Sequence, residues 1–510
     1  MKKPTAISRA SHVNAGTSVP HDELPWPESE GRVLRMPKLH TELDERAPWT
    51  PYGGLALFAE TCRRLRVAES LDDHVEVLKA HLPYHESDHI LAQAASLYVG
   101  GTCIEDMMYL QKDEAVLRMF GACRTPDPTT AGDFLRRFDE HANPGSLQSL
   151  RRAIDEIQER AWRRLAKKQD GRRRKRSVAI VDLDGHIKEL CGVQFEEADF
   201  SYDGRWSFNA LVASLRGTGE CLAVRLRSGN TRSSDDAAEL LRELLPRLLR
   251  HFDEVLVAGD SDFDRSDIRQ ACNLGGVYFA FVGRETTNRP EIAGNIPSWR
   301  PFRTRAARQR ARARNRKGYR SRARKPNRRK QRAWQRGYRD KKLVKQWVGG
   351  TTFTPPGDQR PLRLIVRQQL IDTSDKNQGR LFLEYRYRYV VTNLPCSWSV
   401  EDVIDETYKR CDQENVIEQL GSGLAMWRMP VKEFMGNEAW LEIARLAWNL
   451  RSWIAQLALP EETVRWEWKR FRKAFVHVAA QVVKRSRQVW MRFAGSHRFV
   501  CTLVAAHARL

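Results

Sequence analysis

Three acidic residues that are far apart in the sequence have settings suited to binding a divalent cation: Asp184, Asp260 and Glu414. Asp184 and Asp260 each follow a short apolar run, in VAIVDLDG and EVLVAGDSDF, which is typical of a buried strand. Glu414 lies in TYKRCDQENVIEQL, whose pattern predicts a helix. Carboxylate oxygens suit hard cations such as Mg²⁺, and two such ions can activate a water or a 3′-hydroxyl for phosphodiester chemistry. We therefore expect the three acids to form one metal site.

Two neighbouring acids compete for these roles. Asp182 and Asp262 each lie two residues from a favoured aspartate. We favour Asp184 because an Asp-Gly pair after a strand marks its exposed end, whereas Asp182 is expected to be more buried or on the opposite face. We favour Asp260 because it follows the apolar VLVAG directly.

The elements around the two aspartates predict an α/β arrangement. The strands are expected at VAIVDLD, KELCGVQFEEADF, ECLAVRLRSGN, EVLVAGDS and VYFAFVGR. Helices are expected at DAAELLRELLPRLLRHF and SDIRQACNLG, which gives the order β-β-β-α-β-α-β. This order suits a mixed sheet with helices on its faces.

A strongly basic segment separates the second and third acids. Residues 299–345 carry Arg or Lys at nearly every second position, and such a run cannot bury a core by itself. Together with a net charge of +23, it favours a nucleic-acid partner. We expect this basic insertion to contact phosphates and to offer aromatic rings to bases, or else to be a solvated loop. The candidate DNA-contacting residues in and just after it are Arg328, Arg329, Lys330, Trp334 and Trp347.

The remaining segments are predicted to be mainly helical. Residues 53–165 carry apolar residues at helical spacing, and within them PDPTTAGDFLRRFDEH predicts a capped helix that either reads DNA or simply packs. The nine cysteines include no C-x-x-C pair and read as reduced thiols, and no apolar run reaches membrane length. The expected domains are a partly ordered arm (1–52), an all-α DNA-binding domain (53–166), a core in two parts (177–298 and 396–455), a basic then β-rich insertion (299–395) and a basic helical C-terminal region (456–510).

The motifs DLDG and GDSDFD also resemble those of phosphatases of the haloacid dehalogenase type. That resemblance implies that Asp182 is a nucleophile, Asp184 an acid/base, and Asp260 with Asp264 metal ligands. The family also needs a basic residue near the phosphoryl group, and the only lysine between the motifs, Lys188, is too close to the first. This alternative leaves the basic insertion and Glu414 unexplained.

The pieces PDPTTAGDFLRRF, VDLDG, GTGECLAVRLRSGNT, AGDSDF, RYVVTNLP and RCDQENVIEQL occur in the order in which DDE transposases of bacterial insertion sequences carry them. They cover roughly residues 53–450 and resemble most the insertion-sequence-1380 family, which has a β-strand insertion before the glutamate. The resemblance implies a multidomain α/β protein with an RNase H-like mixed-sheet catalytic core. It also implies that Asp184, Asp260 and Glu414 are catalytic ligands of two Mg²⁺ ions, with Mn²⁺ able to substitute.

The resemblance extends to a signature of Tyr, Arg, Glu and Lys on the helix of the glutamate. Arg410 and Glu414 match it, Tyr408 lies one place beyond the tyrosine position, which holds Thr407, and the lysine position holds Gly421. The family implies that Arg410 contacts DNA phosphate, and Tyr408 and Asn415 are carried over as DNA-binding residues. The simplest alternative is that Arg410 and Glu414 form a surface ion pair on a helix.

By this resemblance the protein is a cut-and-paste transposase that acts on double-stranded DNA at the transposon ends and the target. A homodimer is expected on DNA, and the expected location is the bacterial cytoplasm, at the nucleoid, with no membrane association. An aromatic residue of the insertion, Trp334 or Trp347, is a candidate for holding a flipped base. The departures at Thr407 and Gly421 leave open a decayed or domesticated transposase that only binds DNA.

Overall fold

The computed structural model describes residues 48–81, 83–169, 176–286, 288–305, 307–308, 342–372, 383–485 and 488–510. Two compact units make up the chain. The sheet unit comprises Gln169–Glu418, and the helical unit comprises the residues up to Lys168 together with Gln419–Leu510. Most of the predicted N-terminal arm and most of the basic insertion, including Arg328, Arg329, Lys330 and Trp334, lie outside the described residues.

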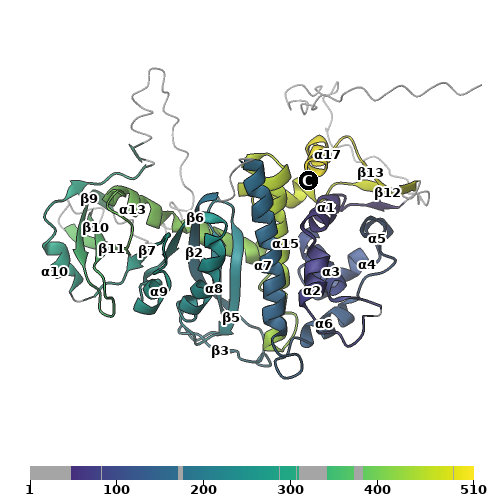
Figure 1. The fold of residues 1–510 in the computed structure, drawn as a ribbon, viewed down its shortest axis with the longest axis horizontal. Coiled ribbons are helices and arrows are strands. Elements are labelled where there is room, and N and C mark those ends of the chain that lie inside the picture. Colours follow the sequence, from purple (N-terminus) through teal and green to yellow (C-terminus); the bar gives the residue numbers. More distant parts are fainter. Residues whose placement is uncertain are drawn as a thin grey trace, which may run out of the picture. The chain divides into compact units, whose positions relative to one another are not determined.

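Ten strands of the described chain form one mixed sheet in the sheet unit (Figure 1). Their order is β3-β4-β2-β6-β7-β11-β10-β9-β8, and β5 pairs with β4. The pairs β2–β6 and β6–β7 are parallel, and the others are antiparallel, so the predicted mixed sheet is confirmed. The strands are β2 (Arg176–Glu189), β3 (Asp199–Phe200), β4 (Trp206–Leu215), β5 (Glu220–Ser228), β6 (Phe252–Gly259), β7 (Val277–Gly283), β8 (Arg300–Pro301), β9 (Lys342–Phe353), β10 (Leu362–Asp372) and β11 (Leu383–Thr392).

The helices of the sheet unit cover the sheet and carry the third acid. α13 packs on β7, β9, β10 and β11 through a core that includes Leu256, Ile365, Val390, Val403 and Ile404. α8 packs on β5 and β6, and α14 packs on β2 and β4. The helices are α8 (Ala237–Leu249), α9 (Ser266–Ala271), α10 (Arg289–Gly294), α13 (Val400–Thr407) and α14 (Cys411–Glu418), with short 3₁₀ turns η3 (Ser261–Phe263) and η4 (Tyr408–Arg410).

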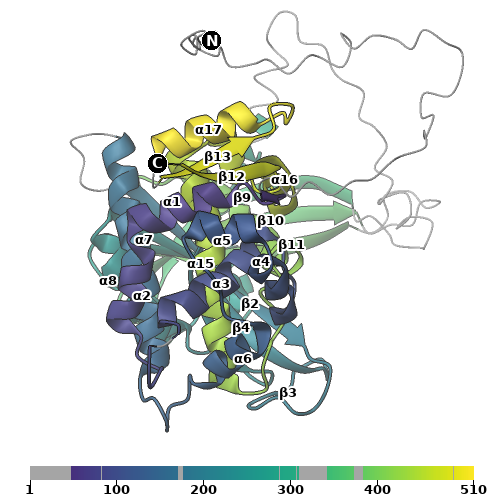
Figure 2. The same ribbon diagram turned by 90° about the vertical axis from the view of Figure 1, so that its right-hand side faces the viewer.

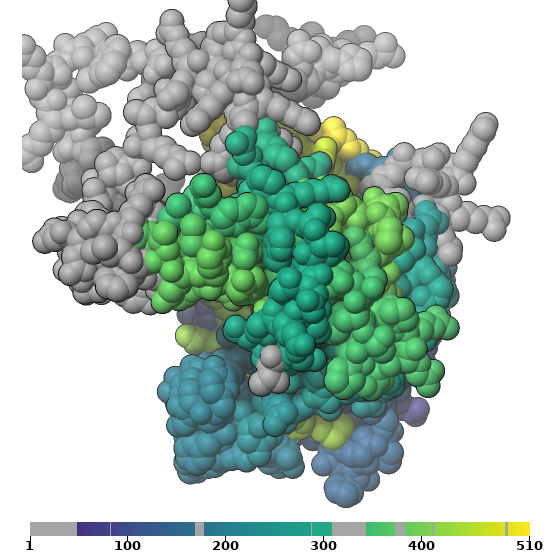
Figure 3. Space-filling view, turned by 90° about the vertical axis from the view of Figure 1, so that its left-hand side faces the viewer, coloured from purple at the N-terminus to yellow at the C-terminus, as the bar shows by residue number. Residues whose placement is uncertain are grey.

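The strands after the basic insertion form one side of the sheet unit. β9, β10 and β11 pair in long antiparallel register, as the predicted β-rich part of the insertion requires. In Figure 3 these green strands and the teal segment that precedes the insertion are both at the surface. Ile296 of that preceding segment would lie only 2.6 Å from a Cβ at Gly349 of β9, so the strand needs glycine there to pack closely.

The second predicted strand, in residues 188–200, was wrong for residues 190–198, which are not in a strand. β2 continues to Glu189, β3 occupies Asp199–Phe200, and the long partner of β2 is β4. The prediction failed because WSFNALVASL was not recognised as a strand, although its residues from Ser207 to Leu215 are buried. One consequence is that Asp184 lies inside β2 and not at its end.

The helical unit is organised around α15 (Phe434–Ala458), which is buried over most of its 25 residues (Figure 2). It packs on α1, α3, α6 and α17. Arg151 of α7 also reaches it, with Nη2 2.6 Å from an oxygen of Glu438. The other helices are α1 (Leu55–Leu65), α2 (Val67–His74), α3 (Glu86–Val99), α4 (Met107–Gln111), α5 (Glu114–Phe120), α6 (Pro128–Arg136), α7 (Ser146–Gln169), α16 (Trp468–Phe475) and α17 (Val500–Arg509), with short turns η2 (Ile104–Asp106), η5 (Gln419–Gly423) and η6 (Glu461–Arg465).

α6 is the helix predicted from PDPTTAGDFLRRFDEH. Asp127 caps it, because its side chain accepts a hydrogen bond from the Thr130 amide at 2.9 Å, and Pro128 opens its first turn. Phe134 and Leu135 bury its inner face. These contacts account for the helix as a packed element, and its reading of DNA stays a prediction.

The prediction of a helical C-terminal region was wrong for residues 480–493. There β12 (Ala480–Arg485) and β13 (Gln488–Phe493) form an antiparallel pair, which β1 (Trp49–Thr50) extends to three strands. The segment is basic and apolar in a way that fits either periodicity, and pairing with the distant β1 favours the strand. The units also divide the chain differently from the predicted domains: the predicted second core segment, 396–455, is split after Glu418, and 456–510 shares a unit with 53–166. Among the helices of the described chain, none is long and apolar enough to span a membrane.

Candidate active site

Asp184 and Asp260 are brought level by the register of two parallel strands. The last paired residues of β2 and β6 are Asp182 and Ala258, and each favoured aspartate lies two residues further on. β2 continues past this point and pairs only with β4, where Val212 faces Asp184. Parallel strands end at the same edge of a sheet, so both carboxylates lie at the carboxyl end of β6.

The turn after β6 fixes Asp260. Its side chain accepts a hydrogen bond from the Asp262 amide at 2.9 Å and thereby caps η3. A Cβ at Gly259 would lie 2.8 Å from the Cβ of Phe263, so this tight turn needs the glycine that directly precedes Asp260. Asp260 itself is half-buried.

Glu414 comes from α14, which packs across β2 and β4. The residue before it, Gln413, is 1% exposed and bonds to β4. Glu414 and the following Asn415 are both exposed. α14 therefore directs the Gln413 amide into the sheet and presents Glu414 on its exposed side.

The charges of Asp260 and Glu414 both act on the carboxylate of Asp184, and its pKa reflects this. Burial raises it to about 6 from the ordinary 3.8. The positive charge of Arg410 opposes this increase, whereas the negative charges of Asp260 and Glu414 add to it. Arg410 Nη1 lies 3.3 Å from Asp184 Oδ2. Asp260, Glu414 and Arg410 thus all lie within electrostatic reach of Asp184, and their role as one metal site stays a prediction.

These residues fit a divalent cation. All three acids offer oxygen ligands, which hard cations require. Burial is the first cause of the raised pKa of Asp184, and the charges of Asp260 and Glu414, which a cation would balance, add to it. The carboxylate oxygens are not all within 4.8 Å of one another, which is consistent with their mutual repulsion.

Asp182 is not part of this group of acids. It is 1% exposed and pairs with Arg216, whose Nε lies 2.8 Å from Asp182 Oδ2. Arg216 Nη1 also lies 2.9 Å from Glu406 Oε1. A carboxylate neutralised in this way is a structural ion pair, and sequence reasoning missed Arg216 because the strand β4 that precedes it was not predicted.

Two other predicted site residues, Tyr408 and Trp347, lie away from the acids or in the core. Tyr408 packs into the core under α13, and the guanidinium of Arg367 lies 5.5 Å from its ring centre, so its position is that of a packed residue. Trp347 lies on β9, four strand positions from β6, which is roughly 19 Å at ordinary strand spacing. The structure therefore does not bring Trp347 to the acids.

Another group with metal-ligand spacing lies in the helical unit. Ligand atoms of Asp72, His85 and Glu86 all lie within 4.8 Å of one another. Asp72 already accepts hydrogen bonds from the amide and hydroxyl of Ser87, and Glu86 accepts from the amides of Val77 and Leu78. These bonds account for the cluster as a structural feature of the α2–α3 connection.

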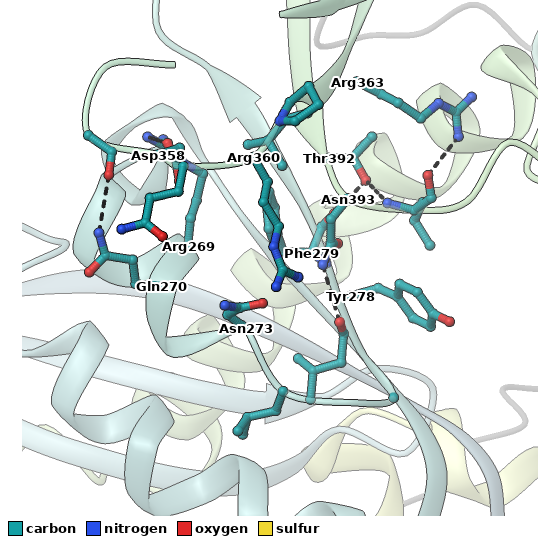
Figure 4. Close-up of a pocket in the computed structure, with 18 residues that line it drawn as sticks. Arg269, Gln270, Asn273, Tyr278, Phe279, Asp358, Arg360, Arg363, Thr392 and Asn393 are labelled. Carbon is teal, nitrogen blue, oxygen red and sulfur yellow. Dashed lines mark hydrogen bonds and ion pairs between the residues drawn. The ribbon is translucent and has the colours of Figure 1, made fainter. Parts of the chain in front are cut away.

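The sheet unit also has a hollow of about 740 Å³ at the start of β7 (Figure 4). Asp260 follows the end of the parallel strand β6, so it lies at the opposite end of the sheet. Two arginines of the hollow already serve the fold. Arg269 pairs with Asp264 and Asp358, and Arg363 donates to the carbonyls of Leu394, Pro395 and Trp398. The hollow is thus separate from the acids.

Comparison with known proteins places the chain in a family. Residues 49–510 match the model of a family described as transposase DDE domain group 1. No curated protein compared with the chain matches it. Among solved structures, the chain is similar to piggyBac transposase in a cryo-EM synaptic complex with hairpin DNA, at 10% identity and a TM-score of 0.38, over 84% of this chain and 83% of that one. This distant likeness transfers no feature. Because the family model spans nearly the whole chain, the protein belongs to the group 1 family of DDE-domain transposases.

Proposed function

We propose that this protein is an active DNA transposase of the insertion-sequence-1380 type, with an RNase H-like catalytic core. It would bind the terminal inverted repeats of its own element, cleave phosphodiester bonds at the ends, and join the released 3′-hydroxyls to target DNA. The observation that carries the proposal is the convergence of Asp184, Asp260 and Glu414 beside Arg410, from two strands and a helix.

The three acids would hold two Mg²⁺ ions, or Mn²⁺ in their place. When bound, such ions lower the pKa of a water and stabilise a leaving oxygen in phosphodiester cleavage. Asp184 and Asp260 are fixed by strand register and by a capped turn, so they need little reorganisation to act as ligands. Arg410 pairs with Asp184, and it would hold a DNA phosphate near the acids.

The DNA would be held largely by charge. The +23 net charge and the basic insertion support phosphate contacts, which predict binding that weakens steeply with salt. We propose that two copies act together on the two ends. Trp334 and Trp347 remain candidates for base contacts; Trp347 is half-buried and its ring centre lies 6.5 Å from that of Tyr385.

The proposal is tested with a DNA duplex that carries a terminal repeat of the element encoding the chain. Wild type, Asp260→Ala and Glu414→Gln are compared for binding and for Mg²⁺-dependent cleavage. We expect the wild type to cut at the repeat end, and both variants to bind the duplex without cutting it. Cleavage by either variant at the wild-type rate would refute the assigned acids.

A DNA-binding protein without activity is the second candidate. It is favoured by Thr407, which is buried and donates to the Val403 carbonyl in place of a site tyrosine, and by Gly421, where a Cβ would lie 2.5 Å from Trp427. A lysine at position 421 would clash there. Specific binding of the repeat with no cleavage by the wild type would select this candidate.

A further inference from the structure

Gln413 joins α14 to the sheet directly beside the acids. Its Nε2 donates to the Val212 carbonyl at 3.3 Å, and its Oε1 accepts a hydrogen bond from the Ser214 hydroxyl. Gln413 and Ser214 are each 1% exposed. Both ends of the amide are therefore satisfied inside the protein, where an unpaired amide is costly.

The two partners of Gln413 face the aspartates of β2. Val212 is the residue opposite Asp184 in the β2–β4 pairing, and Ser214 is opposite Asp182. Gln413, which directly precedes Glu414, is thus bonded to Val212, the residue across from Asp184. The Gln413 side chain therefore ties the helix to the strand at the level of the acids.

The apolar packing of α14 controls this position less well than the hydrogen bonds of Gln413 do. The helix is eight residues long, and among its described side chains Ile417 is the buried apolar one. An apolar contact resists separation but permits sliding along the sheet, because it has no preferred direction. Two hydrogen bonds to β4, at Val212 and at Ser214 two residues further on, do have a direction, so they resist a shift in register.

We propose that Gln413 is a positioning residue that holds Glu414 in place for metal binding opposite Asp184. The inference rests on the proposed function, because it takes Glu414 to be a metal ligand. Groups that orient metal ligands through hydrogen bonds typically contribute roughly 10- to 100-fold in metal affinity or activity.

The experiment measures Mn²⁺ affinity of the full-length protein by calorimetry and, separately, the rate of cleavage of the terminal-repeat duplex. Gln413→Leu keeps most of the buried volume and removes both hydrogen bonds, and Ser214→Ala removes only one. We expect Gln413→Leu to weaken Mn²⁺ binding roughly 10- to 100-fold, with cleavage partly restored at high Mn²⁺. Ser214→Ala should shift both quantities in the same direction by less, and it serves alone if Gln413→Leu does not fold.

Gln270→Leu is the matched control, because Gln270 also bonds to a backbone carbonyl, that of Gly357 at 3.2 Å, but from α9. It should leave Mn²⁺ affinity unchanged. If Gln413→Leu lowers the melting temperature but binds Mn²⁺ like the wild type, Gln413 only packs and the inference is overturned. Glu414→Gln tests the proposed metal site itself: if this variant binds Mn²⁺ and cleaves normally, the proposed function fails.

Discussion

Arg410 Nη1 lies 3.3 Å from Asp184 Oδ2, although the two residues are 226 positions apart in the sequence. Arg410 is placed by the 3₁₀ turn between α13 and α14, and Asp184 by the middle of β2. Burial and the negative charges of Asp260 and Glu414 raise the pKa of Asp184, and the positive charge of Arg410 limits this rise. This contact links the segment before Glu414 to the first acid.

Removal of the positive charge of Arg410 should impair cleavage without unfolding the protein. We expect Arg410→Gln to lower the cleavage rate roughly 100-fold, because a charged donor that acts on the reacting phosphate is lost. The neighbouring Lys409→Gln is the control, since Lys409 is 42% exposed and pairs with Glu406. Rates are measured on the terminal-repeat duplex at saturating DNA. An equal loss in both variants would mean that only general positive charge matters.

Substitution of Asp182 should reveal a structural role. Asp182→Asn leaves the buried Arg216 without its full partner, which costs about 3–5 kcal/mol in the free energy of unfolding. Denaturant unfolding measures this loss. The wild type should not turn over p-nitrophenyl phosphate, because Asp182 is neutralised and unavailable as a nucleophile. Turnover that disappears in Asp182→Asn would instead support the phosphatase alternative.

The helical unit contains a buried charge network whose loss should be costly. Glu442 is 1% exposed and lies 3.3 Å from Arg151 Nε and 2.7 Å from Arg445 Nε. We expect Glu442→Gln to reduce the free energy of unfolding by about 3–5 kcal/mol, since two cations lose their shared partner. Glu114→Gln breaks an exposed pair with Arg118 in the same unit and should cost less than about 1 kcal/mol. Similar losses in both variants would contradict this account.

Acid should destabilise the helical unit through His89. The ring is 3% exposed and stacks on Phe134 at 4.5 Å, and burial lowers its pKa to about 4 from 6.5. As the pH falls, His89 therefore takes up a proton in the unfolded state before it does so in the folded state. The contribution of the neutral ring to the free energy of unfolding is complete above pH 6.5 and is lost as the pH falls toward 4. The loss amounts to about 3 kcal/mol. His89→Phe keeps the stacking and removes the titrating group. Its melting temperature should therefore fall less steeply than that of the wild type between pH 7 and pH 4. Identical slopes would exclude His89 as the source.

Much of the candidate site was predictable because its acids follow local patterns. An apolar strand that runs into an aspartate is visible in VAIVDLDG and EVLVAGDSDF, and the signature around Glu414 is a matter of spacing along one helix. The family resemblance then grouped residues that no local pattern connects. Tyr408 shows the limit of that procedure, because its place in the signature did not reveal that it packs under Arg367.

The sequence by itself determined which acidic residues are candidates for a cation site, that a mixed sheet carries two of them, and that a basic insertion precedes the third. Only the tertiary structure decided that Asp182 is neutralised by Arg216, that Gln413 anchors α14 opposite Asp184, and that β12 pairs with β1. The physical reason is the same in each case. These outcomes depend on partners that are distant in the chain, and a pattern of residue types along one segment contains no information about which distant segment packs against it.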